Sequence, residues 1–406
     1  MSIFREIPPT AGFPVYWSDL LPLLKFQKYR QNLEDDFKKY LGVDYAKITY
    51  SGTAAFYFIL EGLKELSPKK TVIIPSFICP LVPLAIARAG LKVEVCDIAE
   101  DSFNFDLKQL EGQCCAEDIL AVVPAHLGGL ALEFSQIEKI ARKYGIFIIE
   151  DCAQSLGASY QGKKIGTLGD FGFFSLCRGK GLTIYEGGLL VAKQQVHKEV
   201  IERKIKTIVK KDYFSEGLKI LELFGYALFY RPFGFWFIFS LPQIFWKLRG
   251  NKLRAMIEDF KEDFAVHGVS GLRKSIGHLG FHRLEDEIKQ QREKADYYLQ
   301  GLKNLKGVRA IKESSLGQGT YPFLTLLFDD PVKRNRFLDA YGNCGLGVSI
   351  IYTSVLTGYS YLKEIVPQKE FPAGSFLAER HLTLSTSTFL KRGDQDRLLE
   401  IIRNYV

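Results

Sequence analysis

Lys180 is the residue whose surroundings point most directly to chemistry. An apolar run at residues 147–149 leads into Asp151, and Gln154 follows three residues later. A second apolar run ends at Ser175, five residues before Lys180, which stands between two glycines. A lysine amine can condense with an aldehyde, a buried carboxylate can pair with a pyridinium nitrogen, and a strand-end hydroxyl can hold a phosphate. This set of residues predicts a site for pyridoxal phosphate.

Composition and charge place the chain among folded globular proteins. It has 406 residues, 47% hydrophobic and 25% charged, enough for a large domain with a smaller one attached. The seven cysteines are scattered without C-x-x-C spacing, so we expect no disulfide framework, no zinc site and a cytoplasmic location. The amino terminus lacks the pattern of a secretory signal. The net charge of +8 favours anionic small molecules or an anionic membrane surface, and no nucleic-acid motif accompanies it.

Apolar runs of strand type alternate with helix-like segments in the first half of the chain. Apolar runs cover residues 71–75, 119–123 and 146–149, and a shorter run at 91–95 alternates between apolar and charged residues. Helical spacing is found at 81–89 and 137–144. This alternation predicts an α/β fold with a mostly parallel sheet covered by helices on both faces. Ligands bind at the carboxyl ends of such strands, so Asp151, Ser175 and the turn 51–53 are expected to meet there.

The second half of the chain predicts a smaller α+β domain. Its expected elements are a charged amphipathic helix at 285–306, a strand at 321–328, a helix at 332–341, a strand at 346–350 and a closing helix near 394–405. We therefore divide the chain into four parts. They are an N-terminal helical arm (1–44), a large cofactor-binding domain (45–210), an aromatic-rich insertion (211–265) and a small C-terminal α+β domain (266–406).

Residues 223–246 differ from the rest of the chain because they carry a single charge, Arg231. Pro232 and Pro242 are expected to prevent one continuous helix, and only 15 uncharged residues follow Arg231, fewer than the roughly 20 that span a bilayer. Aromatic residues suit the headgroup boundary, and the basic residues that follow suit anionic lipids. We predict that segment 223–254 contacts a membrane surface or a lipid-linked substrate. The alternative is burial in a dimer interface or under the small domain.

Three of the candidate features also have structural explanations that need no cofactor. The Ser51-Gly52-Thr53 turn can cap a helix, although exposed amides at a helix start also suit a phosphate. Asp151 can anchor a strand end, and Lys180 can be an exposed loop lysine.

The histidines carry weaker signals. His126 has no evident acid–base partner in the sequence, so we expect it to be structural or to support the site from behind. His278 and His282 have the i, i+4 spacing of a helical metal pair. No glutamate or third ligand accompanies them at a suitable spacing, and we expect no metal site.

The motifs of residues 45–192 follow one another in a distinctive order. They are Ser51-Gly52-Thr53, Pro75-Ser76-Phe77, Pro124 to Gly128, Glu150 to Gln154, Gly166 to Asp170, and Ser175-x4-Lys180 followed by Gly187-Gly188. In this order they resemble the DegT/DnrJ/StrS-type sugar aminotransferases, which are fold-type I pyridoxal phosphate enzymes. Weaker similarity returns at 283–305 and near Tyr352. The resemblance implies a seven-stranded type of sheet in the large domain.

The resemblance also implies a role for each matched residue. Lys180 would bind the cofactor aldehyde covalently and, once freed, move the proton between the substrate carbon and the cofactor. Asp151 would pair with the pyridinium nitrogen, and Gln154 would contact the ring 3′-oxygen. The residues expected at the phosphate are Gly52, Thr53 and Ser175. Family members are dimers with the site at the subunit boundary, so we expect a homodimer.

The chain departs from the family pattern at three places. Cys79 stands where the family usually has an aromatic residue over the cofactor ring, so stacking must come from elsewhere or be weaker. The family's N-x-R motif, which reaches the phosphate of the other subunit, would fall near Val266 and Gly268, and neither residue type is there. Residues 210–265 match no part of the family pattern.

We expect an aminotransferase that moves an amino group, with glutamate as donor, to a keto-sugar carried on a nucleotide or a lipid. Such a reaction belongs to polysaccharide, lipopolysaccharide or glycoconjugate biosynthesis. One alternative is a non-catalytic cofactor-binding homologue of the same fold. A dehydratase of the same family is disfavoured, because that branch replaces the lysine with histidine. The expected location is the cytoplasm, with contact to the inner face of the membrane through 223–254.

Overall fold

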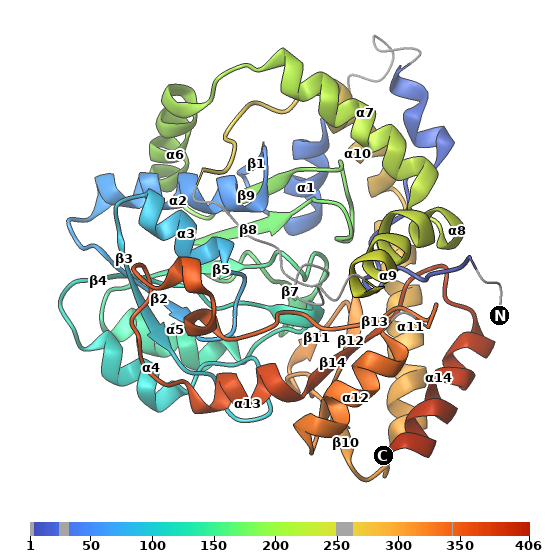
Figure 1. Ribbon diagram of the computed structural model, residues 1–406. Coiled ribbons are helices and arrows are strands. Elements are labelled where there is room, and N and C mark those ends of the chain that lie inside the picture. The colour runs from blue at the N-terminus through green and yellow to red at the C-terminus, as the bar shows by residue number, and fades with distance from the viewer. Residues whose placement is uncertain (1–3, 24–31, 249–262, 343) are drawn as a thin grey trace.

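The computed structural model describes residues 4–23, 32–248, 263–342 and 344–406. A seven-stranded sheet lies at the centre of the larger part (Figure 1). In spatial order its strands are β1 (Ala46–Thr49), β9 (Gly188–Ala192), β8 (Phe171–Ser175), β5 (Phe147–Asp151), β4 (Ile119–Val122), β2 (Thr71–Pro75) and β3 (Lys92–Cys96). All neighbours from β8 to β3 are parallel, whereas β9 runs antiparallel to both β1 and β8. The expected mostly parallel sheet is confirmed.

Helices cover both faces of this sheet, as the continuous apolar strands require. The helices of this part are α2 (Gly52–Leu66), α3 (Leu81–Arg88), α4 (Leu107–Cys114), α5 (Phe134–Lys143) and α6 (Gln195–Ile208). α2 packs on α3, α6, β8 and β9, while α4 and α5 pack on each other and on β3 and β5. Every residue of β4 and β9 is buried, so the centre of the sheet lies inside the core.

The C-terminal part is an α+β unit built on an antiparallel sheet, which confirms the expected fold class. Its strands, in spatial order, are β10 (Val308–Ala310), β12 (Phe323–Phe328), β14 (His381–Ser385) and β13 (Val348–Ser349). Its helices are α10 (Gly271–Phe281), α11 (Leu284–Leu302), α12 (Pro331–Tyr341), α13 (Pro372–Arg380) and α14 (Arg392–Tyr405). The strand expected at 346–350 is short, because only Val348 and Ser349 pair with β14.

Short elements connect the two parts. A small sheet of β11 (Gly317–Gln318), β6 (Ser159–Tyr160) and β7 (Lys163–Lys164) joins segments that are far apart in the chain. At the N-terminal end, an extended stretch leads to a 3-10 helix, η1 (Trp17–Leu23), and to α1 (Leu33–Leu41). The division into four domains stays a prediction.

The aromatic-rich segment forms two helical pieces. α7 (Tyr213–Phe229) ends before Arg231, and a second run joins α8 (Pro232–Phe235), the π-helix η4 (Trp236–Ser240) and α9 (Leu241–Leu248). Pro232 begins this second run, as expected. Pro242 does not interrupt it, and the wider π-turn just before Pro242 relieves the usual clash of a proline ring with a preceding carbonyl.

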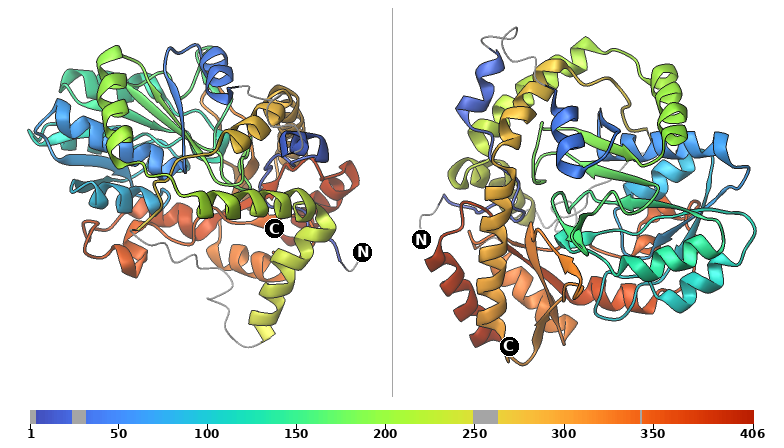
Figure 2. Two further views of the ribbon diagram at one scale, coloured as in Figure 1. Left: turned by 90° about the horizontal axis from the view of Figure 1, so that it is seen from above. Right: turned by 180° about the vertical axis from the view of Figure 1, so that it is seen from behind.

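The run from α8 to α9 projects from the body of the protein (Figure 2, left). Within the described residues, no helix is both long enough and apolar enough to cross a membrane. The basic residues Arg249, Lys252 and Arg254, on which part of the membrane prediction rests, lie outside the described residues.

Candidate active site

The carboxyl end of β5 delivers Asp151 into a buried position. Its side chain is almost fully enclosed, and Oδ1 accepts a hydrogen bond of 2.9 Å from the amide of Ala153. No ion pair to this carboxylate is found within the described residues. Burial raises the pKa of Asp151 to about 6, and the hydrogen bond from Ala153 and the nearby charge of Lys180 oppose this rise. A buried carboxyl group in this state can take a cationic N–H partner, which a pyridinium ring would supply.

The carboxylate of Glu150, the preceding residue, is already occupied by hydrogen bonds from the protein backbone. Its two oxygens accept hydrogen bonds from the amides of Gly166, Leu168 and Gly169, at 2.7 to 2.8 Å. Adjacent residues of a strand point to opposite faces, so the two carboxylates serve different surroundings. Glu150 holds the loop after β7, and Asp151 is the one left for a ligand.

His126 has the partner that its sequence context did not reveal. Its Nδ1 accepts a hydrogen bond from the amide of Leu132 at 3.2 Å, so Nε2 carries the proton and donates to Glu150 at 3.3 Å. The ring is buried. His126, Glu150 and Cys152 are close enough to share a metal ion, but the ring nitrogens of His126 and both oxygens of Glu150 are occupied by these hydrogen bonds. This cluster therefore acts as a structural network behind Asp151.

The start of α2 meets the end of β8. The hydroxyl of Ser51 accepts a hydrogen bond from the amide of Ala54 at 3.0 Å, which caps the helix. A Cβ on Gly52 would lie 3.3 Å from the Cβ of Ser175, so the backbone of Gly52 lies directly against the strand end. The first amides of a helix, here those of Gly52 and Thr53, have no acceptor within their own helix. Together with the helix dipole and the Ser175 hydroxyl, they can hold a phosphate.

Lys180 lies in a tight turn after β8. Its amide donates to the carbonyl oxygen of Cys177 at 3.2 Å, and Gly179 has a φ of +73°, which favours glycine. The residue is half-buried, and its charge acts on the Asp151 carboxyl. The structure thus brings the lysine loop to the same edge of the sheet as Asp151 and Ser175.

Gln154 connects this edge to the C-terminal part. Its Oε1 accepts from the amide of Gly128 at 2.9 Å, and its Nε2 donates to the hydroxyl of Tyr352 at 3.3 Å. Tyr352 also contacts Cys79 and packs edge-on against Phe77, with ring centroids 5.3 Å apart.

Sequence reasoning did not assign a role to Tyr352. Its signals were the weak family similarity near this position and an aromatic residue just after the strand expected at 346–350. The structure places this ring beside Cys79, the position where an aromatic residue is missing.

The remaining sequence candidates lie elsewhere. His278 is hydrogen-bonded to Asp36 and its ring packs edge-on against that of His282, with the two Nε2 atoms 3.3 Å apart. Val266 and Gly268 belong to an extended segment whose His267 packs edge-on against Tyr50, with ring centroids 5.5 Å apart.

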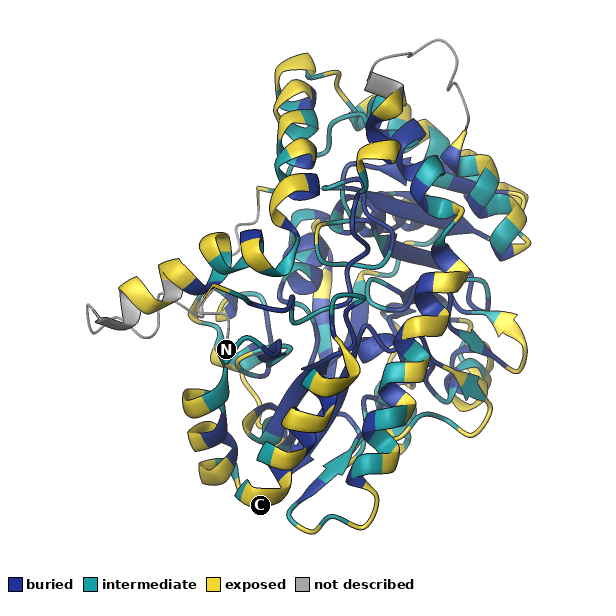
Figure 3. Cartoon of the chain, turned by 90° about the vertical axis from the view of Figure 1, so that its right-hand side faces the viewer, coloured by how far each residue is buried: buried dark blue, intermediate teal, exposed yellow. Residues whose placement is uncertain are grey.

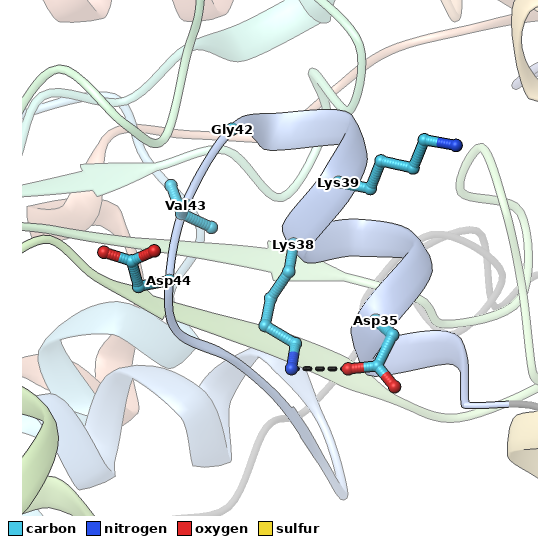
Figure 4. A pocket seen from close by; sticks show the side chains of 6 residues that line it. All are labelled: Asp35, Lys38, Lys39, Gly42, Val43 and Asp44. Atoms are coloured by element: carbon cyan, nitrogen blue, oxygen red, sulfur yellow. Dashed lines mark ion pairs between the residues drawn. The ribbon is translucent and has the colours of Figure 1, made fainter.

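A shallow hollow opens beside α1 on the surface (Figure 4). It is lined by Asp35, Lys38, Lys39, Gly42, Val43 and Asp44. Lys38 and Asp35 form an ion pair across one turn of the helix. None of the residues around Asp151 or Lys180 lines this hollow, and we assign it no role.

The site fits the cofactor expected from the sequence. It offers an enclosed carboxylate for a ring nitrogen, a helix start and a hydroxyl for a phosphate, and a lysine in a glycine-flanked turn. These groups come from β5, α2, β8 and the turn after β8, which the parallel sheet brings to one edge.

Known proteins with similar sequences support this reading. The sequence model of the DegT/DnrJ/EryC1/StrS aminotransferase family matches residues 23–225 and 269–403. The UDP-4-amino-4,6-dideoxy-N-acetyl-beta-L-altrosamine transaminase of Campylobacter jejuni is 35% identical over 179 residues, 43% of this chain and 45% of that protein. The spore coat polysaccharide biosynthesis protein SpsC of Bacillus subtilis is 23% identical over 381 residues, 93% of this chain and 89% of that protein.

The fold is also found among solved structures. An aminotransferase of the same family from Brucella abortus superposes with a TM-score of 0.72 at 21% identity, covering 96% of this chain and 94% of that one. The family match omits residues 226–268, which include the projecting α8–α9 run.

Proposed function

This chain belongs to the DegT/DnrJ/EryC1/StrS aminotransferase family and is a sugar aminotransferase that depends on pyridoxal phosphate; we propose that Lys180 is the residue that carries the cofactor. The observation that carries this proposal is the buried Asp151 carboxylate, on which the charge of Lys180 acts. The bound cofactor supplies an aldehyde for the amino group and an electron-withdrawing ring.

Each residue at the sheet edge then has a physical task. The Asp151 carboxylate holds the proton on the ring nitrogen, because an enclosed anion and a cationic N–H stabilise each other. The amides of Gly52 and Thr53 and the hydroxyl of Ser175 bind the phosphate. Gln154, whose Oε1 accepts from the amide of Gly128, would donate from its amide nitrogen to the ring 3′-oxygen.

Lys180 has two tasks in this proposal. Its Nζ would hold the cofactor aldehyde in the resting enzyme and, once free, would carry the proton to and from the substrate carbon. We propose that the protein forms a homodimer and that glutamate is the amino donor.

We propose a keto-sugar carried on a nucleotide as the acceptor. Support comes from the Campylobacter jejuni relative, whose name is that of a UDP-sugar transaminase. A lipid-linked sugar is a second candidate, favoured by the apolar surface described next.

The segment from α7 to α9 carries many exposed apolar side chains, and exposed positions run along its projecting part (Figure 3). Its exposed side chains are Tyr213, Phe214, Leu218, Leu221, Phe224, Leu228, Phe229, Phe233, Phe237, Ile238, Leu241, Ile244 and Phe245. We call these residues the apolar face. Patches of this kind on a single chain mark a contact with a partner or a membrane.

We propose that the apolar face contacts the surface of an anionic membrane. Residues 204–254, which contain it, carry ten basic and only three acidic side chains. Aromatic side chains beside a positive charge excess suit the boundary of an anionic bilayer. Contact with a second copy of the chain is the alternative that an experiment must separate.

A direct test of the function uses the visible absorption of the bound cofactor. The purified protein should absorb in the visible range, and glutamate should remove that band as the amino group is taken up. Candidate acceptors, first UDP- and GDP-linked 4-keto-sugars and then polyprenyl-phosphate-linked ones, should restore it. A protein that binds the cofactor but keeps the band with every amino donor would contradict the proposal.

A further inference from the structure

The turn that contains Lys180 is held by the N-terminal stretch of the chain. The hydroxyl of Thr10 donates a hydrogen bond of 2.7 Å to the carbonyl oxygen of Gly179. The amide of Phe13 lies 3.3 Å from the carbonyl oxygen of Lys180 and 3.0 Å from that of Gly181. Three consecutive carbonyl groups of the lysine turn are thus bound by a segment about 170 residues earlier in the sequence.

The two backbones approach very closely. A Cβ on Gly12 would lie 2.7 Å from the Cα of Gly179 and 2.6 Å from the hydroxyl of Tyr230. Real Cβ contacts are not this short, so only glycine at position 12 allows the segment to lie against the turn.

Two tyrosines at the end of α7, Tyr226 in its last turn and Tyr230 directly after it, hold this segment from the other side. The hydroxyl of Tyr230 donates to the carbonyl oxygen of Thr10 at 3.0 Å, and that of Tyr226 donates to the carbonyl oxygen of Phe13 at 3.2 Å. Their rings stack with centroids 4.3 Å apart, and both side chains are buried. Burial raises the pKa of Tyr230 to about 12, so its hydroxyl stays a donor at neutral pH.

The C-terminal part adds a third attachment. The amide of Ala11 donates to the carbonyl oxygen of Pro322 at 2.7 Å, and Gln291 donates to the carbonyl oxygen of Ala11 at 3.1 Å. The stretch 10–13 is therefore fixed along its whole length. Its hydrogen bonds to residues 179–181 transmit that rigidity to the lysine turn.

We propose that residues 10–13 form a clamp that positions Lys180, anchored by Tyr226 and Tyr230 at the C-terminal end of α7. The proposal rests on the proposed function, in which Lys180 carries the cofactor. It also gives the aromatic-rich segment a task inside the protein. The buried side of α7 fixes the clamp, while its outer side belongs to the apolar face.

The physical reason is the flexibility of the turn itself. Glycines on both sides of Lys180 leave the backbone many alternative conformations. An amine that must attack and then move a proton has to stay within about 3 to 3.5 Å of its target. The hydrogen bonds from Thr10 and Phe13 restrict the backbone of the lysine turn to one conformation before the cofactor or substrate binds.

The test compares Thr10→Val, which removes the hydroxyl at nearly constant volume, with Thr10→Ser, which keeps it. Amide hydrogen exchange is measured on the apoprotein for the peptide that covers residues 177–183. We expect about tenfold faster exchange in Thr10→Val, the size of one lost hydrogen bond, and less than twofold change in Thr10→Ser. In the loaded enzyme, Thr10→Val should lower kcat with little change in KM, and Thr10→Ser should restore it.

Tyr230→Phe is the second variant. It removes the hydrogen bond to the carbonyl oxygen of Thr10, so it should also speed up amide exchange in residues 177–183 and lower kcat. Borohydride trapping is run on every variant to locate the cofactor. If exchange and kcat of Thr10→Val stay within twofold of wild type while the adduct remains on Lys180, the clamp is overturned and the proposed function stands. If the adduct of the wild type lies on another lysine, the proposed function fails, and the clamp fails with it.

Discussion

Gly52 packs closely against Ser175: a Cβ on Gly52 would stand 3.3 Å from the Cβ of Ser175 and 3.3 Å from the carbonyl oxygen of Phe174. The two residues are far apart in sequence, and the antiparallel strand β9 helps to bring them together. A Cβ on Gly188, which pairs with both Thr49 and Ser175, would lie 2.5 Å from the amide nitrogen of Gly52. The proposed phosphate site thus depends on the absence of side chains at two glycines.

Gly52→Ala should weaken cofactor binding. The added methyl group must push α2 and β8 apart by a few tenths of an ångström, which misplaces the amides of Gly52 and Thr53 relative to Ser175. We expect the dissociation constant of pyridoxal phosphate, measured by fluorescence titration of the apoprotein, to rise at least about tenfold.

Gly112→Ala is the matched control for this change. Gly112 lies in helix α4, and a Cβ there would meet nothing within 4 Å. Alanine in a helix is more stable than glycine by roughly 1 kcal/mol, so this variant should keep cofactor affinity and gain stability. Equal affinities for Gly52→Ala and wild type would argue against a phosphate at the start of α2.

Asp151→Asn should keep the cofactor but lose most of its turnover. A neutral amide can still accept the hydrogen bond of Ala153, but it cannot hold the ring nitrogen protonated. We expect a fall in kcat of at least about a hundredfold, measured in single-turnover reactions with glutamate. Activity of this variant near the wild-type level would mean that Asp151 has only a structural role at the end of β5.

The apoprotein of Asp151→Asn should be more stable than wild-type apoprotein at pH 8. Burial raises the pKa of Asp151 from 3.8 to about 6, so the folded state binds this proton more tightly than the unfolded state. The resulting loss of stability is absent below pH 3.8, grows between pH 3.8 and 6, and then stays constant at about 3 kcal/mol.

Urea unfolding of the two apoproteins at pH 8 and pH 4 measures this effect. The difference in free energy of unfolding between the Asp151→Asn apoprotein and the wild-type apoprotein should be large at pH 8 and small at pH 4. A difference that does not change with pH would mean that the Asp151 carboxyl is better solvated than the structure indicates.

Liposome co-sedimentation tests the apolar face. The wild type should bind vesicles containing anionic lipid, and the binding should weaken with salt because it combines apolar and ionic attraction. A Phe214→Ser, Leu221→Ser, Phe233→Ser variant should lose it, since these side chains are 84%, 67% and 64% exposed and contribute little to the core.

Leu316→Ser combined with Val332→Ser is the control, because both side chains are about half exposed and lie outside the apolar face. This pair should leave vesicle binding unchanged. If the wild type binds no vesicle of any composition, and the triple variant changes from dimer to monomer in light scattering, the apolar face is a contact between copies of the chain.

The elements that could be predicted from the sequence are those with a strong local pattern. β2, β4, β5 and β8 are continuous apolar runs, and each lies where the pattern placed it. The charged helix α11 and the closing helix α14 likewise follow their periodicity. Because the carboxyl ends of parallel strands share an edge, the meeting of Asp151 with Ser175 also followed from the pattern.

The parts that escaped prediction depend on contacts between distant segments. β14 follows α13 directly, and only its pairing with both β12 and β13 makes it a central strand. Tyr352 reaches Gln154 across almost 200 residues, and Thr10 reaches Gly179 across 169. Neither contact leaves a periodic trace in the sequence, because each is a single hydrogen bond set by the tertiary fold.

The most direct measurement of the central claim is the position of the cofactor on the chain. The wild type, loaded with pyridoxal phosphate, is reduced with borohydride, digested and mapped by mass spectrometry. The pyridoxyl group should lie on the peptide that contains Lys180, and Lys180→Ala should show no adduct while keeping its fold by circular dichroism. An adduct on any other lysine, or an unchanged adduct in Lys180→Ala, would contradict the account.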